Sequence, residues 1–159
     1  MLRYADTDVV FQEVPDEVSL AISIAGCPNG CPGCHSPHLL DDAGPMLDAA
    51  ELHRLVECCG SGITCVCFMG GDAAPEQVRA LALGLRELHP HLRVAWYSGR
   101  QLLPQGFDTS AFDYIKLGPY VEAQGPLSSP TTNQRMLRRR PDGSWDDITS
   151  RFQRRGPLG

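Results

Sequence analysis

Four short apolar runs along the chain predict buried β-strands. The run at 63–71, ITCVCFMGG, is continuous and stops at two glycines. A run of this length and ending is typical of a strand that is buried on both faces of a parallel sheet. The four predicted strands lie within residues 17–26, 63–71, 92–99 and 112–120.

Two segments between these runs have the spacing of amphipathic helices. Residues 46–59 begin with Asp48, a favourable N-cap, and Glu51 follows three residues later, as in a capping box. Residues 74–90 end at Pro90, which cannot continue a helix. The apolar positions of this second segment are Val78, Leu81, Leu85 and Leu88.

The alternation of strands and helices predicts an α/β fold with a parallel sheet. The length of 159 residues fits one domain, residues 1–159, and from Val121 onward the regular pattern breaks down. The carboxyl ends of parallel strands meet at one edge of a sheet, where ligands bind in such folds. Three loops follow predicted strands in this way: a cysteine-rich loop from Cys27, the turn Gly70–Asp72 and the dipeptide Ser98–Gly99.

Charge is distributed unevenly around a net value of −5. Residues 1–134 contain seven basic and sixteen acidic side chains, whereas residues 135–159 contain seven arginines and three acids. We expect a basic C-terminal tail at about 135–159, in which Arg138, Arg139 and Arg140 help to dock an acidic partner or are simply solvated. The acidic body disfavours nucleic acid as the partner.

The composition also bears on the compartment and on the cysteines. No stretch is apolar enough to span a membrane, and the acidic N-terminus does not resemble a signal peptide, so we expect a cytoplasmic protein. Disulfides are rare in that compartment, and seven cysteines is an odd number. Metal or cluster ligation is therefore the preferred role for the tight cysteine group. We expect Cys58, Cys59, Cys65 and Cys67 to be ordinary apolar side chains.

Cys27, Cys31 and Cys34 have the spacing C-x3-C-x2-C within the stretch GCPNGCPGCHSPH. A structural zinc site needs four ligands, and His35 or His38 is available as the fourth. A ferredoxin-type cluster needs four cysteine ligands, and no fourth cysteine lies near these three. Three thiolates around a four-iron cluster leave one iron open to bind a substrate. A zinc-binding interaction module and a cluster with an open iron are therefore both compatible with this loop.

The C-x3-C-x2-C loop after the first α/β strand resembles the signature of the radical S-adenosylmethionine superfamily. The resemblance implies a partial, open (βα) barrel with mostly parallel strands, a 4Fe-4S cluster and S-adenosyl-L-methionine as cofactors. In that family the open iron holds the amino and carboxylate groups of S-adenosylmethionine. One electron from the reduced cluster breaks a carbon–sulfur bond, which gives methionine and a 5′-deoxyadenosyl radical.

Further stretches resemble the activating proteins of anaerobic (class III) ribonucleotide reductases. These are GCPGCHSPHL, YSG at 97–99 and YIKLGPYVEAQGPLSSPTTNQR, which ends at Arg135. The resemblance implies an oxidoreductase whose substrate is the catalytic subunit of the reductase, on which it forms a glycyl radical by removing a hydrogen atom from a glycine Cα. It also implies a low-potential electron donor such as flavodoxin or ferredoxin. The acidic body and the lack of a long apolar run lead us to expect neither nucleic acid nor membrane as partner. A radical enzyme acting on another substrate is the alternative within the same chemistry.

The resemblance assigns the cluster ligands to Cys27, Cys31 and Cys34 and a set of cofactor contacts to other residues. Asp72 stands where glutamate is common in the superfamily, although reductase-activating members often have aspartate there. The glycines before it offer bare backbone whose carbonyl can accept from the ligand's amino group, or they only form a turn. The full set of contacts is Gly33, Cys34, His35, Gly70, Gly71, Asp72, Ser98 and Lys116.

Three of these contacts have alternative interpretations. Ser98 can hydrogen-bond the ribose or the methionyl carboxylate, or it is a turn residue before Gly99. His35 occupies a position where the family often has an aromatic residue near the adenine, but it is also compatible with exposure to solvent. Lys116 is the only lysine and lies on a strand predicted to be buried, where its charge needs a partner. The family has a D-x-K element on this strand, whereas this chain has D-x-x-K from Asp113. Simple strand alternation places Asp113 and Lys116 on opposite faces.

Overall fold

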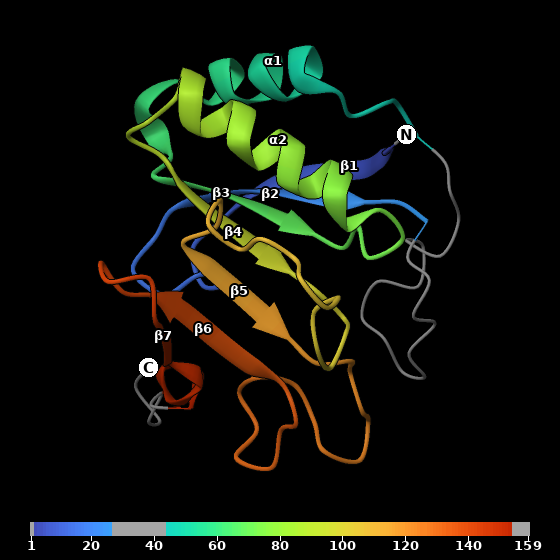
Figure 1. Cartoon of the computed structure of the whole chain (residues 1–159), viewed down its shortest axis with the longest axis vertical. Helices are drawn as coiled ribbons and strands as arrows, with labels where there is room; N and C mark the ends of the chain where they lie inside the picture. The colour runs from blue at the N-terminus through green and yellow to red at the C-terminus, as the bar shows by residue number, and fades with distance from the viewer. Residues whose placement is uncertain (1, 27–43, 154–159) are drawn as a thin grey trace.

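The computed structural model describes residues 2–26 and 44–153, and these form one open sheet of seven strands with two α-helices on one face (Figure 1). The strands follow one another across the sheet in chain order, from β1 at one edge to β7 at the other. The strands are β1 (Tyr4–Val10), β2 (Ser19–Ile24), β3 (Cys65–Met69), β4 (Arg93–Tyr97), β5 (Tyr114–Leu117), β6 (Arg135–Arg139) and β7 (Trp145–Asp147). The helices are α1 (Ala49–Cys59) and α2 (Pro75–Leu88), and two short 3-10 turns, Gly60–Gly62 and Thr149–Phe152, complete the described elements.

The four predicted strands and both predicted helices are confirmed. β2, β3, β4 and β5 are parallel neighbours, as the apolar runs indicated. Asp48 is the N-cap of α1, and its carboxylate accepts a hydrogen bond from the backbone N–H of Glu51 at 2.8 Å. The sequence interpretation missed β1, β6 and β7, which all pair antiparallel with their neighbours.

The expected partial, open (βα) barrel with mostly parallel strands is wrong. The described sheet is mixed, because three of its six strand pairings are antiparallel. A (βα) barrel also needs a helix after each strand, yet residues 98–113 link β4 to β5 without one. This linker contains Pro104 and Gly106, and both residues disfavour a helix interior.

Both helices cover the same face of the sheet and bury its main hydrophobic core (Figure 1). Leu52 and Val56 of α1 and Leu81 of α2 belong to one apolar cluster with the strand residues Phe68 and Trp96. Within the described residues, no helix is long and apolar enough to cross a lipid bilayer.

The opposite face of the central strands contains a second apolar cluster, against which Phe152 of the 3-10 turn packs. Cys65 and Cys67 lie on this face with Tyr114 and Met136, and both thiols are free and fully buried. The prediction of an apolar role is confirmed for these two cysteines, whereas Cys58 is exposed. Burial raises the pKa of the Cys65 thiol to about 12, which keeps it protonated and unreactive at neutral pH.

Candidate functional site

The carboxyl ends of the parallel strands bring the predicted site loops to one edge of the sheet. The backbone carbonyl of Ile24, the last residue of β2, lies only 3.2 Å from the position that a Cβ on Gly70 would occupy. The chain therefore leaves β2 beside the turn Gly70–Asp72, and Cys27 follows three residues after Ile24. The five predicted contacts of the cysteine loop, Cys27, Cys31, Gly33, Cys34 and His35, lie outside the described residues.

The two ends of the segment that contains these cysteines are fixed to the same short stretch of backbone. The N–H of Ala25 donates to the carbonyl of Arg3 at 2.9 Å, and the N–H of Tyr4 donates to the carbonyl of Pro45 at 3.1 Å. Arg3 and Tyr4 are consecutive, so the chain departs from and returns to neighbouring positions next to β1. This backbone pairing holds the base of the cysteine segment against the sheet.

Gly70 and Gly71 are required by the backbone and by packing. Both adopt positive φ, 102° and 91°, a region that disfavours residues with a Cβ. A Cβ on Gly71 would also lie 2.5 Å from a methyl carbon of Val78 in α2. Trp96 donates its indole N–H to the carbonyl of Gly70 at 2.7 Å, and the carbonyl of Gly71 accepts from Ala74 at 3.0 Å. Both carbonyls thus already accept a hydrogen bond, which favours the turn interpretation of these glycines over direct ligand contact.

Asp72 joins the loops after β3 and β4. Its carboxylate, in a residue that is 1% exposed, accepts from the Ser98 hydroxyl at 2.6 Å and from the Gly99 N–H at 2.7 Å. Its backbone carbonyl accepts from the Arg100 guanidinium at 2.9 Å. The structure therefore brings together Asp72 and Ser98, which the sequence assigned to one site. It also adds Arg100, which the sequence analysis missed although it directly follows the YSG stretch.

Lys116 is buried at the carboxyl end of β5, next to the Asp72 cluster. The backbone N–H of Ser98 donates to the carbonyl of Lys116 at 2.9 Å, which joins the two strand ends. The ammonium group donates to the carbonyl of Gly118 at 3.0 Å and lies 5.4 Å from the ring centroid of Tyr97. The carbonyl and the aromatic ring both stabilise this buried cation. As strand alternation predicted, Asp113 does not pair with Lys116: its carboxylate binds Arg86 at 3.0 Å.

The TTNQR stretch packs against the same strand end and contains an unsatisfied acceptor. Asn133 donates its amide N–H to the carbonyl of Pro119 at 3.0 Å, whereas its buried Oδ1 atom has no hydrogen-bond partner. The backbone of Asn133 lies within 3.3 Å of the position of a Cβ on Gly118. Buried acceptors are almost always paired, so this oxygen fits a ligand donor. The sequence analysis quoted this stretch but gave Asn133 no role.

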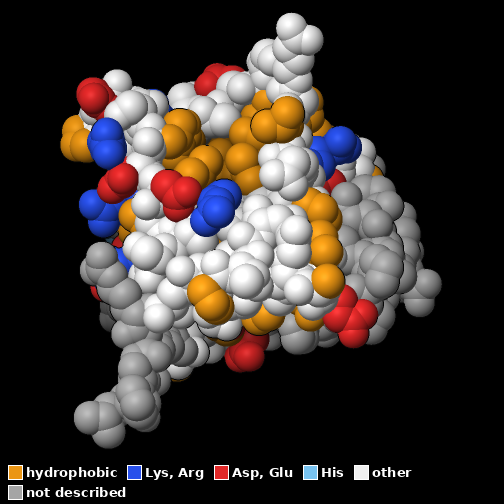
Figure 2. Space-filling view, turned by 90° about the horizontal axis from the view of Figure 1, so that it is seen from below, with side chains coloured by type: hydrophobic (Ala, Val, Ile, Leu, Met, Phe, Trp, Pro, Cys, Tyr) orange, Lys and Arg blue, Asp and Glu red, His pale blue; other side chains and the backbone are white. Residues whose placement is uncertain are grey.

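The face of the molecule below the view of Figure 1 is chemically mixed (Figure 2). Hydrophobic side chains are exposed side by side over part of this face, and acidic and basic side chains lie next to them (Figure 2). Two apolar residues in the loops that follow β4 and β5 are exposed: Leu102 is 78% exposed and Val121 is 36% exposed. A surface of this kind is compatible with contact to another macromolecule.

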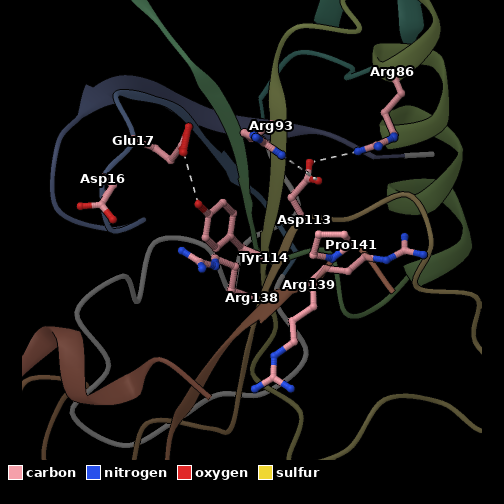
Figure 3. A pocket seen from close by; sticks show the side chains of 10 residues that line it. Asp16, Glu17, Arg86, Arg93, Asp113, Tyr114, Arg138, Arg139 and Pro141 are labelled. Atoms are coloured by element: carbon pink, nitrogen blue, oxygen red, sulfur yellow. Dashed lines mark hydrogen bonds and ion pairs between the residues drawn. The ribbon is translucent and has the colours of Figure 1, made fainter. Parts of the chain in front are cut away.

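The opposite end of the parallel strands has a polar pocket of about 730 Å³ with five arginines in its lining (Figure 3). Asp113 accepts from the backbone of Val94 at 2.9 Å and from Arg86, and Arg93 lies 3.9 Å from its other carboxylate oxygen. The remaining arginines are Arg138, Arg139 and Arg140, which belong to or directly follow β6. The basic segment that begins at Arg135 therefore starts as a strand of the sheet, and three of its arginines line this pocket.

Comparisons with known proteins return no relative for this chain. No family model, no curated protein and no solved structure matches it.

Proposed function

We propose that the chain is a radical S-adenosylmethionine activating enzyme that forms a glycyl radical on an anaerobic ribonucleotide reductase. The observation that supports it best is positional: the C-x3-C-x2-C segment leaves the sheet beside the Gly70–Asp72 turn, at the edge where buried Asp72, Ser98 and Lys116 also gather. Cys27, Cys31 and Cys34 are the proposed ligands of the 4Fe-4S cluster.

The described residues of this edge fit the amino-acid part of S-adenosylmethionine. That part has one carboxylate and one ammonium group. Lys116 offers a buried cation for the carboxylate, and Asn133 offers a buried oxygen that lacks a donor. Both side chains lie next to Gly118. Lys116 donates a hydrogen bond to the carbonyl of Gly118, and Asn133 packs against Gly118. A cation and an acceptor next to the same glycine can therefore bind the two charged groups of one zwitterion.

The other residues of the edge hold the loops in place. The Asp72 carboxylate accepts hydrogen bonds from Ser98 and Gly99, and these bonds hold the loops after β3 and β4 in a fixed relative position. When bound, the reduced cluster and S-adenosylmethionine supply the 5′-deoxyadenosyl radical. The chain's own residues need only bind, orient and exclude water, because hydrogen-atom abstraction requires no acid or base.

The partner follows from this chemistry. A glycine Cα radical is stabilised by its flanking amides, and glycine has no side chain that blocks access. The exposed apolar and charged side chains beside the edge would contact the reductase segment that carries this glycine. A low-potential donor such as flavodoxin or ferredoxin would supply the electron.

The test is anaerobic reconstitution with iron and sulfide, followed by reduction in the presence of S-adenosylmethionine. The parent protein is expected to become brown, to bind about four irons, and to form 5′-deoxyadenosine and methionine. The variant Cys31→Ala should lose the cluster. Cys58→Ala is the matched control, because Cys58 is an exposed free thiol on α1, and it should retain iron and product.

Two outcomes would contradict the proposal. A colourless protein that contains one zinc ion, lost in Cys31→Ala, would identify the cysteine loop as a zinc module. Formation of S-adenosylhomocysteine in place of 5′-deoxyadenosine would identify methyl transfer.

A further inference from the structure

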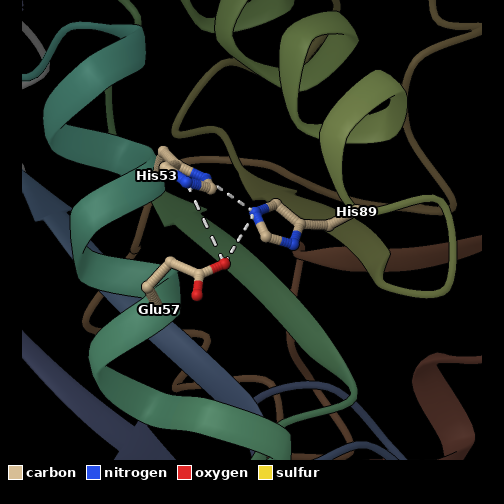
Figure 4. A group of neighbouring side chains, drawn as sticks. All are labelled: His53, Glu57 and His89. Atoms are coloured by element: carbon tan, nitrogen blue, oxygen red, sulfur yellow. Dashed lines mark hydrogen bonds and ion pairs between the residues drawn. The ribbon is translucent and has the colours of Figure 1, made fainter.

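Three potential metal ligands converge between the two helices. His53 and Glu57 lie on α1, and His89 directly follows α2 (Figure 4). One ligand atom from each residue lies within 4.8 Å of the others. None of these residues belongs to the carboxyl-edge site, so the cluster is independent of the function proposed above.

The helices position all three side chains. His53 and Glu57 are four residues apart and therefore project from the same side of α1. His89 caps the end of α2, where its backbone N–H donates to the carbonyl of Leu85 at 2.7 Å. The packing of α1 against α2 then brings His89 to His53, and their rings stack with centroids 5.1 Å apart.

The distances are close to those of a tetrahedral zinc site. Nδ1 of His53 lies 3.0 Å from Nε2 of His89, and Oε1 of Glu57 lies 3.9 Å from the same His89 nitrogen. Two zinc bonds of about 2.0–2.1 Å at a tetrahedral angle place their ligand atoms about 3.3 Å apart. These two distances lie on either side of this value. Oε1 of Glu57 lies 4.0 Å from Nε2 of His53, the ring nitrogen that does not face His89. Glu57 is 61% exposed, so its carboxylate can rotate toward an ion held by the two imidazoles, whereas His89 is held by burial.

The chemistry of the three groups also favours a divalent cation. Two imidazole nitrogens that face each other at 3.0 Å need one proton between them. A metal ion can take the place of that proton and bind both lone pairs. Imidazole and carboxylate together are a common ligand set for zinc.

We propose that His53, Glu57 and His89 form a zinc-binding site that links α1 to the end of α2. Three protein ligands leave the fourth position to water, because His53 and Glu57 face solvent. The bound ion would add metal–ligand bonds between α1 and the end of α2, and would therefore stabilise the helical layer over the sheet.

The test is a zinc titration of the full chain in competition with a chromophoric chelator. The three loop cysteines are replaced by serine, since thiolates also bind zinc. We expect one zinc ion per chain and a higher melting temperature with zinc. His53→Gln should weaken binding by about 100-fold and Glu57→Gln by about tenfold. Glu87→Gln is the matched control on an exposed neighbour outside the cluster, and it should bind as the parent does.

His53 is exposed, so its replacement tests the site without disturbing the core. Replacement of the buried His89 is checked for folding by circular dichroism before its affinity is measured. Cobalt provides a second measurement, because its visible spectrum distinguishes nitrogen and oxygen ligands from thiolates. Equal zinc affinity in the parent and His53→Gln, or a cobalt spectrum typical of thiolate ligation, would overturn the proposal.

Discussion

The two ends of the parallel strands each contain a carboxylate that links neighbouring segments, but the two carboxylates differ in their donors. At the carboxyl end, Asp72 accepts from the hydroxyl of Ser98 and the N–H of Gly99, and the residue is 1% exposed. At the amino end, Asp113 accepts from the N–H of Val94 and from the guanidinium of Arg86, and its side chain is 17% exposed.

This difference predicts that the contacts of Asp72 depend less on salt than those of Asp113. The hydrogen bonds that Asp72 accepts from Ser98 and Gly99 are buried and come from neutral donors, so they should depend little on ionic strength. Ion pairs near solvent are weakened by salt, so the arrangement at Asp113 depends on ionic strength. The carboxyl end is therefore suited to hold a small ligand, and the amino end is suited to steer a charged partner.

The largest expected effect comes from removing the two carboxylates in turn. Asp72→Ala leaves the buried Ser98 hydroxyl and Gly99 N–H without their acceptor, and should lower the free energy of unfolding by about 3 kcal/mol. Asp113→Ala should cost about 1–2 kcal/mol, and less at high salt. Urea unfolding at two salt concentrations measures both. Equal losses with equal salt dependence would remove the distinction between the two ends.

A second prediction concerns the apolar cluster that contains Cys65 and Cys67, against which Tyr97 packs. Burial raises the pKa of Cys65 to about 12, and it also raises the pKa of Cys67 and of Tyr97. Unfolded thiols ionise near pH 8.5, so the folded state holds its protons more tightly above that value. Stability should therefore be intact below about pH 8.5 and should fall as the pH rises toward 12.

Cys65→Ala should flatten this alkaline loss, and unfolding measured from neutral to alkaline pH checks it. Cys58, which is exposed, should react with a thiol reagent in the native protein, whereas Cys65 should react only after unfolding. Rapid labelling of Cys65 in the folded protein at neutral pH would show that this apolar cluster is accessible to solvent.

A third prediction concerns the arginines of the pocket. Changing Arg138, Arg139 and Arg140 to serine should slow glycyl-radical formation on the reductase several-fold at low salt, because charge mainly affects the rate of association. Iron content and uncoupled S-adenosylmethionine cleavage should not change. Electron paramagnetic resonance time courses at low and moderate salt provide the measurement. Identical rates at low salt would leave the pocket without a docking role.

The smallest effect is expected for single exposed ion pairs at the amino end. Arg93→Gln removes a guanidinium 3.9 Å from Asp113 and should change the free energy of unfolding by about 0.5 kcal/mol or less. The change should disappear at high salt. A loss as large as that of Asp113→Ala would mean that Arg93 is the main partner of this carboxylate.

The sequence predicted the elements whose residues are uniformly apolar or regularly amphipathic. β3 and α2 are of this kind, since burial dictates their pattern. β1 is mostly exposed and β6 is rich in arginine, so neither has a hydrophobic pattern that marks a strand. Their antiparallel pairing at the sides of the sheet also explains why a barrel was the wrong expectation.

The site was predictable only as far as topology determines it. Parallel strands bring their carboxyl ends together, which correctly placed Asp72 next to Ser98. Individual hydrogen bonds depend on side-chain rotamers and on close approaches between distant segments. The hydrogen bond from Trp96 to Gly70 and the unsatisfied oxygen of Asn133 could therefore not be predicted from the sequence. The helix cluster of His53 and His89 was missed because its ligands lie far apart in the chain.

The most direct test of the central claim compares the two ends in one assay of the reconstituted protein. The measured quantity is the yield of 5′-deoxyadenosine per assembled cluster, with Lys116→Met and Arg93→Gln beside the parent. Loss of the buried cation that is proposed to bind the ligand carboxylate should lower the yield at subsaturating S-adenosylmethionine by about tenfold or more, whereas Arg93→Gln should match the parent. A parent that assembles its cluster but forms no 5′-deoxyadenosine, or two variants with equal yields, would contradict a cofactor site at the carboxyl edge.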